Sequence, residues 1–233
     1  MSKDNLPSRS SNAEVADFLQ KVAATPMVAR DGGRLIFALD ATASRQPTWD
    51  RACQLQGEMF LATESLGGLT LQLVWYRGMG EFNASKWLTK TSDAVRYMTG
   101  VCCRGGLTQI REVLLHAIGE SRAHRINALV FVGDCVEEDV DELFRLAGQL
   151  GLLGVPAFLF HEGGDAVAGQ ALRRIADLTR GAYCQFDSGS ARQLKELLNA
   201  VAVYAAGGRR ALEELSRHEG GLADKLTFQL RKD

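Results

Sequence analysis

The chain has 233 residues, of which 46% are hydrophobic and 24% charged, and its formal net charge is -1. This length and composition are typical of a globular domain with one large core, and the near-neutral charge indicates no basic surface for nucleic acid or for an anionic membrane. We therefore expect neither of these as a partner.

The sequence also favours a protein that stays inside the cell. It has no run of about eighteen apolar residues that could cross a membrane, and its polar first residues lack the apolar core of a signal peptide. The five cysteines are an odd number without CxxC spacing, which favours a reduced cytosolic protein: Cys53, Cys102, Cys103, Cys135 and Cys184. The four histidines form no metal-binding pair, so we expect them at the surface or at helix ends: His116, His124, His161 and His218.

Residues 1–29 are predicted to form a tail and an amphipathic helix. Ser11 and Glu14 have the spacing of a capping box at the start of this helix. The apolar residues that follow recur on one helical face: Val15, Phe18, Leu19 and Val22. We expect the helix to pack on the domain that follows it.

From residue 30 to residue 207, short apolar runs alternate with helical patterns. Strands are predicted at 35–39, 69–76, 128–132, 155–160 and 182–186, with an antiparallel edge strand at 81–85. Helices are predicted at 47–65, 91–102, 107–118, 136–150, 170–180 and 190–204. The run 69–76 alternates one set of side chains with another, which predicts one wetter face for that strand: Leu69, Leu71, Leu73 and Trp75 on the dry face against Thr70, Gln72 and Val74 on the wetter one.

This alternation predicts βαβ units. We therefore expect an α/β fold with a doubly wound, mainly parallel, Rossmann-like sheet and helices on both faces. Residues 30–207 form the predicted domain, and residues 208–233 are predicted to be a C-terminal extension.

Oxygen-bearing side chains follow several of the predicted strands. Asp40, Thr42 and Ser44 come directly after the first strand, Thr108 opens a helix, and Asp134 follows the strand at 128–132. Each alone is a common turn or cap residue. In an open parallel sheet, however, ligands bind beyond the carboxyl ends of the strands. Two carboxylates and three hydroxyls there are the oxygen donors that Mg²⁺ prefers.

This pattern resembles the von Willebrand factor type A (vWA) family over roughly residues 30–207. That family has a metal-ion-dependent adhesion site (MIDAS) written Asp-x-Ser-x-Ser, with a distal Thr and a distal Asp. The resemblance implies that Asp40, Thr42, Ser44, Thr108 and Asp134 hold Mg²⁺, or Mn²⁺ or Ca²⁺. It also implies an open coordination position for an acidic residue of a partner protein. Thr42 stands where Ser is usual, which keeps the hydroxyl.

Two alternatives stay open. A phosphatase of the haloacid-dehalogenase type needs a second Asp where Thr42 stands, and no nucleophile elbow, Walker motif or dinucleotide fingerprint is present. The acidic residues after Asp134 are expected to cap the next helix: Glu137, Glu138, Asp139 and Asp141. The sequence thus predicts a non-enzymatic, intracellular protein-binding module. The alternatives are a Mg²⁺-dependent hydrolase and a scaffold with a vestigial metal site.

Overall fold

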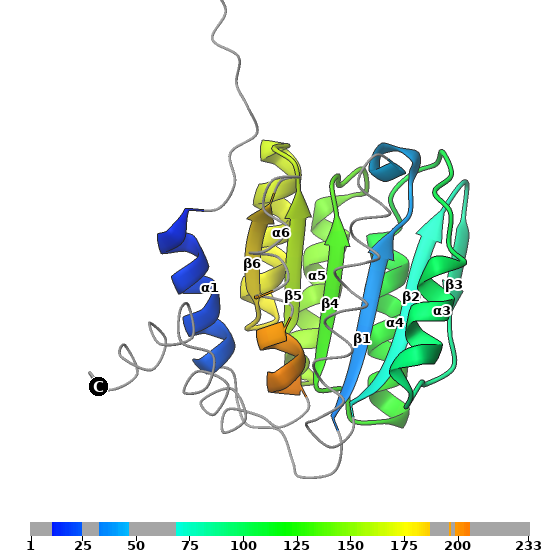
Figure 1. The fold of residues 1–233 in the computed structure, drawn as a ribbon. Helices are drawn as coiled ribbons and strands as arrows, with labels where there is room; N and C mark the ends of the chain where they lie inside the picture. Colours follow the sequence, from blue (N-terminus) through cyan, green and yellow to red (C-terminus); the bar gives the residue numbers. More distant parts are fainter. Residues whose placement is uncertain (1–10, 25–32, 47–68, 187–195, 197–198, 206–233) are drawn as a thin grey trace, which may run out of the picture.

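The computed structural model describes residues 11–24, 33–46, 69–186, 196 and 199–205. These residues contain a six-stranded sheet with the order β3-β2-β1-β4-β5-β6 (Figure 1). The parallel strands are β1 (Arg34–Asp40), β2 (Thr70–Arg77), β4 (Ala128–Gly133), β5 (Ala157–Glu162) and β6 (Ala182–Phe186). Strand β3 (Glu81–Ala84) pairs antiparallel with β2 at the edge, as predicted.

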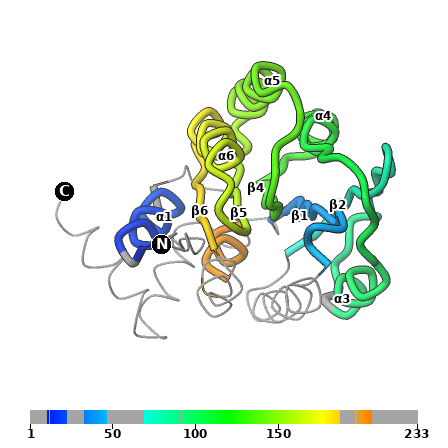
Figure 2. Tube along the Cα trace, turned by 90° about the horizontal axis from the view of Figure 1, so that it is seen from above, coloured from blue at the N-terminus to red at the C-terminus, as the bar shows by residue number. Residues whose placement is uncertain are grey.

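Helices cover both faces of this sheet (Figure 2). One face carries α1 (Asn12–Ala24), α3 (Thr91–Thr99) and the helical residues 199–205. The other face carries α4 (Ile110–Ala123), α5 (Val140–Leu152) and α6 (Ala166–Leu178). Successive strand residues therefore enter opposite cores, because side chains alternate across a sheet. The predicted doubly wound α/β fold is confirmed. No helix among the described residues has the length and apolarity needed to cross a bilayer.

The N-terminal helix packs on the sheet, as expected. The Ser11 amide donates to Glu14 Oε2 at 2.7 Å and the Glu14 amide donates to Ser11 Oγ at 3.2 Å, which is the predicted capping box. The Phe18 ring lies 6.1 Å from that of Phe158 and 5.3 Å from that of Phe160, centroid to centroid. The apolar face of α1 thus extends the core beside β5 and β6.

Several predicted boundaries were wrong by a few residues. The helix predicted at 91–102 ends at Thr99, and those predicted to begin near 107, 136 and 170 begin at Ile110, Val140 and Ala166. Two of these starts are set by aspartate caps, since Asp139 and Asp165 each accept from two backbone amides. The predicted helix at 47–65, most of the one at 190–204, Cys53 and His218 lie outside the described residues.

The predicted wetter face of β2 was also wrong. Gln72 is only 5% exposed and Val74 is completely buried, because α4 covers this face. The Gln72 amide is satisfied inside the protein: it donates to Ser85 O at 3.2 Å and its oxygen lies 2.8 Å from His116 Nε2. Trp75, on the face predicted to be dry, is half-buried, as are Thr70 and Arg77 at the two ends of the strand.

Candidate functional site

The first predicted ligand, Asp40, is the last residue of β1 and is completely buried. Its Oδ1 accepts from the Thr42 amide at 2.8 Å, and its Oδ2 accepts from the Tyr76 hydroxyl at 3.0 Å. Burial raises the pKa of Asp40, although hydrogen bonds from Thr42 and the charge of Arg45 act in the opposite direction. Burial, and then the charge of Asp40, raises the pKa of Tyr76 well above its usual value, so the phenol stays a donor.

The two hydroxyls of the motif lie together after β1. Thr42 is the N-cap of the 3-10 turn η1 (Ala43–Arg45), and its Oγ1 is 3.0 Å from Ser44 Oγ. Thr42 is 5% exposed, whereas Ser44 is exposed. The Arg104 amide donates to Ala41 O at 3.0 Å, and Thr42 forms a parallel bridge with Arg104. This bridge holds the motif loop against the segment that leads to Thr108.

Thr108 lies just before α4 and is bound by two glutamates. Its hydroxyl donates to Glu138 Oε2 at 2.6 Å and accepts from the Glu137 amide at 3.0 Å. The Thr108 amide donates to Glu137 Oε2 at 2.9 Å, and the Arg111 amide donates to Glu138 Oε1 at 2.8 Å. Glu137 and Glu138 therefore bind the N-terminal end of α4, and the expectation that they cap α5 was wrong. Among the four acidic residues, Asp139 is the N-cap of α5.

Asp134 is the first residue after β4, and its Oδ1 is buried with no hydrogen-bond partner in the described part of the chain. The charge of Asp134 raises the pKa of Asp40, so the two carboxylates are close enough to interact. The backbone just before Asp134 also lies close to Asp40, because a Cβ added to Gly133 would lie 3.4 Å from Asp40 Cβ. A buried carboxylate oxygen without a donor is costly and points to a missing positive partner.

His161 contacts the backbone of Asp134. The expectation that His161 lies at the surface or at a helix end was wrong. His161 is a completely buried residue of β5, with Nε2 3.2 Å from Asp134 O and Nδ1 2.8 Å from Tyr183 Oη. A carbonyl only accepts, so we assign the proton to Nε2 and the accepting role to Nδ1. Burial lowers the pKa of His161, which favours this neutral form. His124, by contrast, is exposed at the end of α4, as expected.

Arg45 is a second residue that sequence reasoning missed. Its side chain is 0% exposed, and its guanidinium nitrogens Nε and Nη2 both lie 2.9 Å from Glu162 Oε2. Its Nη1 donates to Asp40 O at 3.1 Å and to Val132 O at 3.2 Å. One buried cation thus joins the carboxyl ends of β1, β4 and β5 directly beneath the motif loop. The only feature of the sequence that could have indicated this role of Arg45 is its position immediately after Ser44.

The donor set fits a hard cation such as Mg²⁺. Within the described ranges, no three residues of the His, Cys, Asp and Glu types are placed to hold a metal, so hydroxyls would have to contribute. Asp134 Oδ1 has no hydrogen-bond partner, and the Thr108 hydroxyl, with one donated and one accepted bond, keeps a lone pair. Asp40, Thr42 and Ser44 also keep acceptor capacity. These oxygens are of the kind that Mg²⁺ takes together with water.

The fold was compared with known proteins. No family model matches the sequence, and the search of curated proteins finds no relative. A von Willebrand factor type A structure from Catenulispora acidiphila has a TM-score of 0.60 and 16% identity over 74% of this chain and 43% of its own. The SpRpn10 VWA domain has a TM-score of 0.59 and 15% identity over 72% of this chain and 95% of its own. The fold is that of a vWA domain.

A third structure with a similar fold is the pilus adhesin SpaC from Lactobacillus rhamnosus GG. It has a TM-score of 0.58 and 10% identity, and the match covers 76% of this chain and 30% of the adhesin. This chain therefore spans less than half of two of these three proteins. At such identities the likeness establishes the vWA fold and leaves the chemistry to the residues of this chain.

Proposed function

We propose that this vWA-fold chain is an intracellular protein-binding module that captures a carboxylate of a partner protein through Mg²⁺ at the carboxyl edge of its sheet. The observation that supports it most is the buried, partnerless Asp134 Oδ1, close to Asp40. A similar fold also occurs in the pilus adhesin SpaC. The odd number of cysteines without CxxC spacing favours a reducing compartment.

The chain's own residues would divide the work at such a site. Thr42, Ser44 and Thr108 offer hydroxyl oxygens, and Asp40 and Asp134 offer carboxylates. Bound Mg²⁺ would supply a positive centre with an open position for a carboxylate of the partner. The buried Arg45 and His161 keep the loops of Ser44 and Asp134 in place before any ion arrives.

The test is a calorimetric titration of the full chain with Mg²⁺, followed by Asp134→Asn and a matched control. Asp134→Asn removes the charge of the partnerless oxygen and is expected to abolish the binding heat. Asp165→Asn is the control, because Asp165 lies beyond another strand of the same sheet but caps α6. Its variant is expected to bind like the parent, since asparagine also caps helices. Unchanged Mg²⁺ binding by Asp134→Asn would reject the assigned site.

Capture of a partner is tested with the same variants. Proteins retained on the immobilised chain in Mg²⁺ should be released by EDTA, and Asp134→Asn should not retain them. Retention that is indifferent to EDTA would refute capture through a metal.

A metal-free scaffold is the second candidate, because one set of contacts favours it. Both Asp40 oxygens and the Thr108 hydroxyl already have partners within the protein. In that case Mg²⁺ would give neither heat nor a shift in melting temperature, and assembly would use another surface of the chain.

A further inference from the structure

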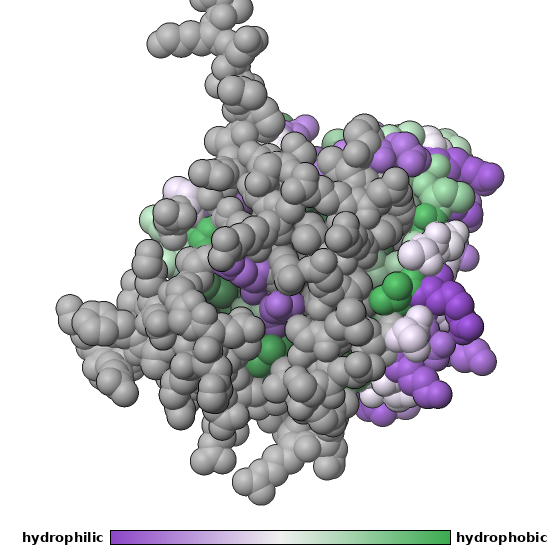
Figure 3. All heavy atoms as spheres, in the orientation of Figure 1, coloured by the Kyte–Doolittle hydropathy of each residue, from purple (hydrophilic) through white to green (hydrophobic). Residues whose placement is uncertain are grey.

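The end of the sheet that carries β3 is rich in positive charge. From 77 to 104 the chain has five cations, Arg77, Lys86, Lys90, Arg96 and Arg104, against two anions, Glu81 and Asp93, although the whole chain has a net charge of -1. The side chains of Arg96 and Arg104 are 77% and 68% exposed. Figure 3 shows hydrophilic residues gathered on the side where Figure 1 places β3 and α3. This surface is electrostatically complementary to an acidic partner.

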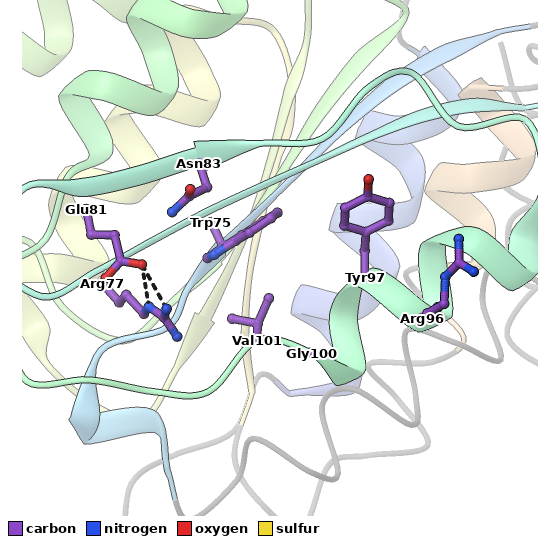
Figure 4. Close-up of a pocket in the computed structure, with 8 residues that line it drawn as sticks. All are labelled: Trp75, Arg77, Glu81, Asn83, Arg96, Tyr97, Gly100 and Val101. Carbon is purple, nitrogen blue, oxygen red and sulfur yellow. Dashed lines mark hydrogen bonds and ion pairs between the residues drawn. The ribbon is translucent and has the colours of Figure 1, made fainter.

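A pocket of about 430 Å³ lies in this surface, between α3 and the strands β2 and β3 (Figure 4). It is lined by Trp75, Arg77, Glu81, Asn83, Arg96, Tyr97, Gly100 and Val101. Figure 4 shows the Arg77–Glu81 ion pair at one end and Tyr97 at the other, with Trp75 between them. This volume lies within the usual range for ligand sites, and it also suits one large side chain.

The chemistry of the lining favours an aromatic group. Arg77 is already satisfied: its Nε donates to Glu81 Oε1 at 2.9 Å and its Nη1 to Cys102 O at 2.7 Å. The half-buried rings of Trp75 and Tyr97 therefore offer the main contact surface. Aromatic side chains pack favourably against such rings in offset or edge-to-face arrangements. The exposed ion pairs of Arg96 with Asp93 and of Arg104 with Glu81 are worth little, so both arginines can turn to a ligand carboxylate.

Strand β3 lies at the edge of the sheet, beside this pocket. In the described part of the chain it pairs only with β2, in a register that sets Asn83 opposite Trp75. The Ser85 amide donates to Leu73 O at 2.8 Å, and bonded pairs alternate along an antiparallel ladder. The amides of Phe82 and Ala84 therefore point away from β2, toward an added strand. Every second side chain of that strand would lie on the pocket face.

We propose that β3 and this pocket bind an extended acidic segment of a partner protein as an additional strand. One aromatic side chain of the segment enters between Trp75 and Tyr97, and its carboxylates meet Arg96 and Arg104. Pairing of the main chains holds the segment, and the pocket selects its sequence. The site uses none of the five predicted metal ligands, so it is independent of the function proposed above.

The test is selection of a displayed library of short random peptides on the full chain in EDTA. Enrichment of acidic peptides with one aromatic residue is expected. A synthetic, labelled copy of the most enriched peptide then gives Kd by fluorescence anisotropy. Arg96→Glu and Tyr97→Ala should each raise Kd about tenfold or more. Arg122→Glu, at an exposed arginine of α4 on the other face, is the matched control and should leave Kd unchanged.

Hydrogen exchange adds a readout specific to strand addition. The bound peptide should slow exchange at Phe82 and Ala84. Arg96→Glu changes an exposed side chain, so the test stays decisive if Tyr97→Ala fails to fold. The proposal is overturned by enrichment of basic peptides or of none, by equal binding to Arg96→Glu, or by protection away from β3. Binding to phosphatidylserine vesicles without peptide enrichment would likewise overturn it in favour of a membrane surface.

Discussion

Replacing Arg45 by methionine tests the buried cation beneath the motif loop. The Arg45 side chain is 0% exposed and that of its partner Glu162 is 12% exposed. Arg45→Met keeps most of the side-chain volume but removes every donor. It leaves the Glu162 carboxylate without its cation, and the carbonyl oxygens of Asp40 and Val132 without its Nη1.

The expected loss follows from this geometry. Removing one partner of a buried ion pair costs about 3–5 kcal/mol, because the other charge stays buried and uncompensated. For a chain of this size, each kcal/mol of lost stability lowers the melting temperature by about 2–4 °C, so the melting temperature should fall by about 6–20 °C. Urea unfolding at neutral pH measures the loss directly, provided that the slope with denaturant is unchanged.

A second substitution separates the ion pair from simple loss of packing. Arg45→Met combined with Glu162→Leu should recover much of the lost stability, since a buried ion pair can be replaced by apolar residues at little cost. A loss below about 1 kcal/mol for Arg45→Met alone, the value of an exposed pair, would refute the reasoning. So would a double variant that is no more stable than the sum of the two single losses predicts.

Three further predictions concern single residues. Gly148→Ala in α5 should stabilise the fold by about 0.5–1 kcal/mol, since the added Cβ meets nothing within 4 Å. Gly151→Ala in the same helix should destabilise the fold by about 1–3 kcal/mol, because its Cβ would lie 2.3 Å from a backbone oxygen of α6. Equal urea midpoints for the two variants would contradict this. Tyr76→Phe should lower the free energy of unfolding by about 1–3 kcal/mol, because it removes the donor to Asp40 Oδ2. Mg²⁺ should raise the melting temperature of this variant more than that of the parent. Equal shifts in melting temperature would speak against a metal beside Asp40. Burial lowers the pKa of His116 below its ordinary value of 6.5. The stability that its neutral form contributes is therefore complete above about pH 6.5 and is lost as pH falls through the folded-state pKa. His116→Gln should lose less stability than the parent between pH 7 and pH 5, and parallel curves of stability against pH would refute this assignment.

The sequence by itself determined the architecture and the places of the candidate ligands. Apolar runs alternating with helical patterns depend on neighbouring residues only, so the sheet class and the capping box of Ser11 and Glu14 were predictable. The same local logic placed Asp40 at the end of β1 and Asp134 directly after β4. Helix starts were less predictable, because caps such as Asp165 decide them residue by residue.

Only the tertiary structure decided what surrounds these ligands. Arg45 and Glu162 are 117 residues apart, and Thr108 and Glu138 are 30 apart, so no local pattern pairs them. A lone arginine after a polar turn is usually a surface residue, and a row of acidic residues before a helix usually caps it. Here the meeting of β1, β4 and β5 buries the arginine, and the approach of the β4–α5 loop to α4 redirects two glutamates. Polar groups buried by such long-range packing must find partners in whatever segment lies beside them, and that neighbour is set by the fold.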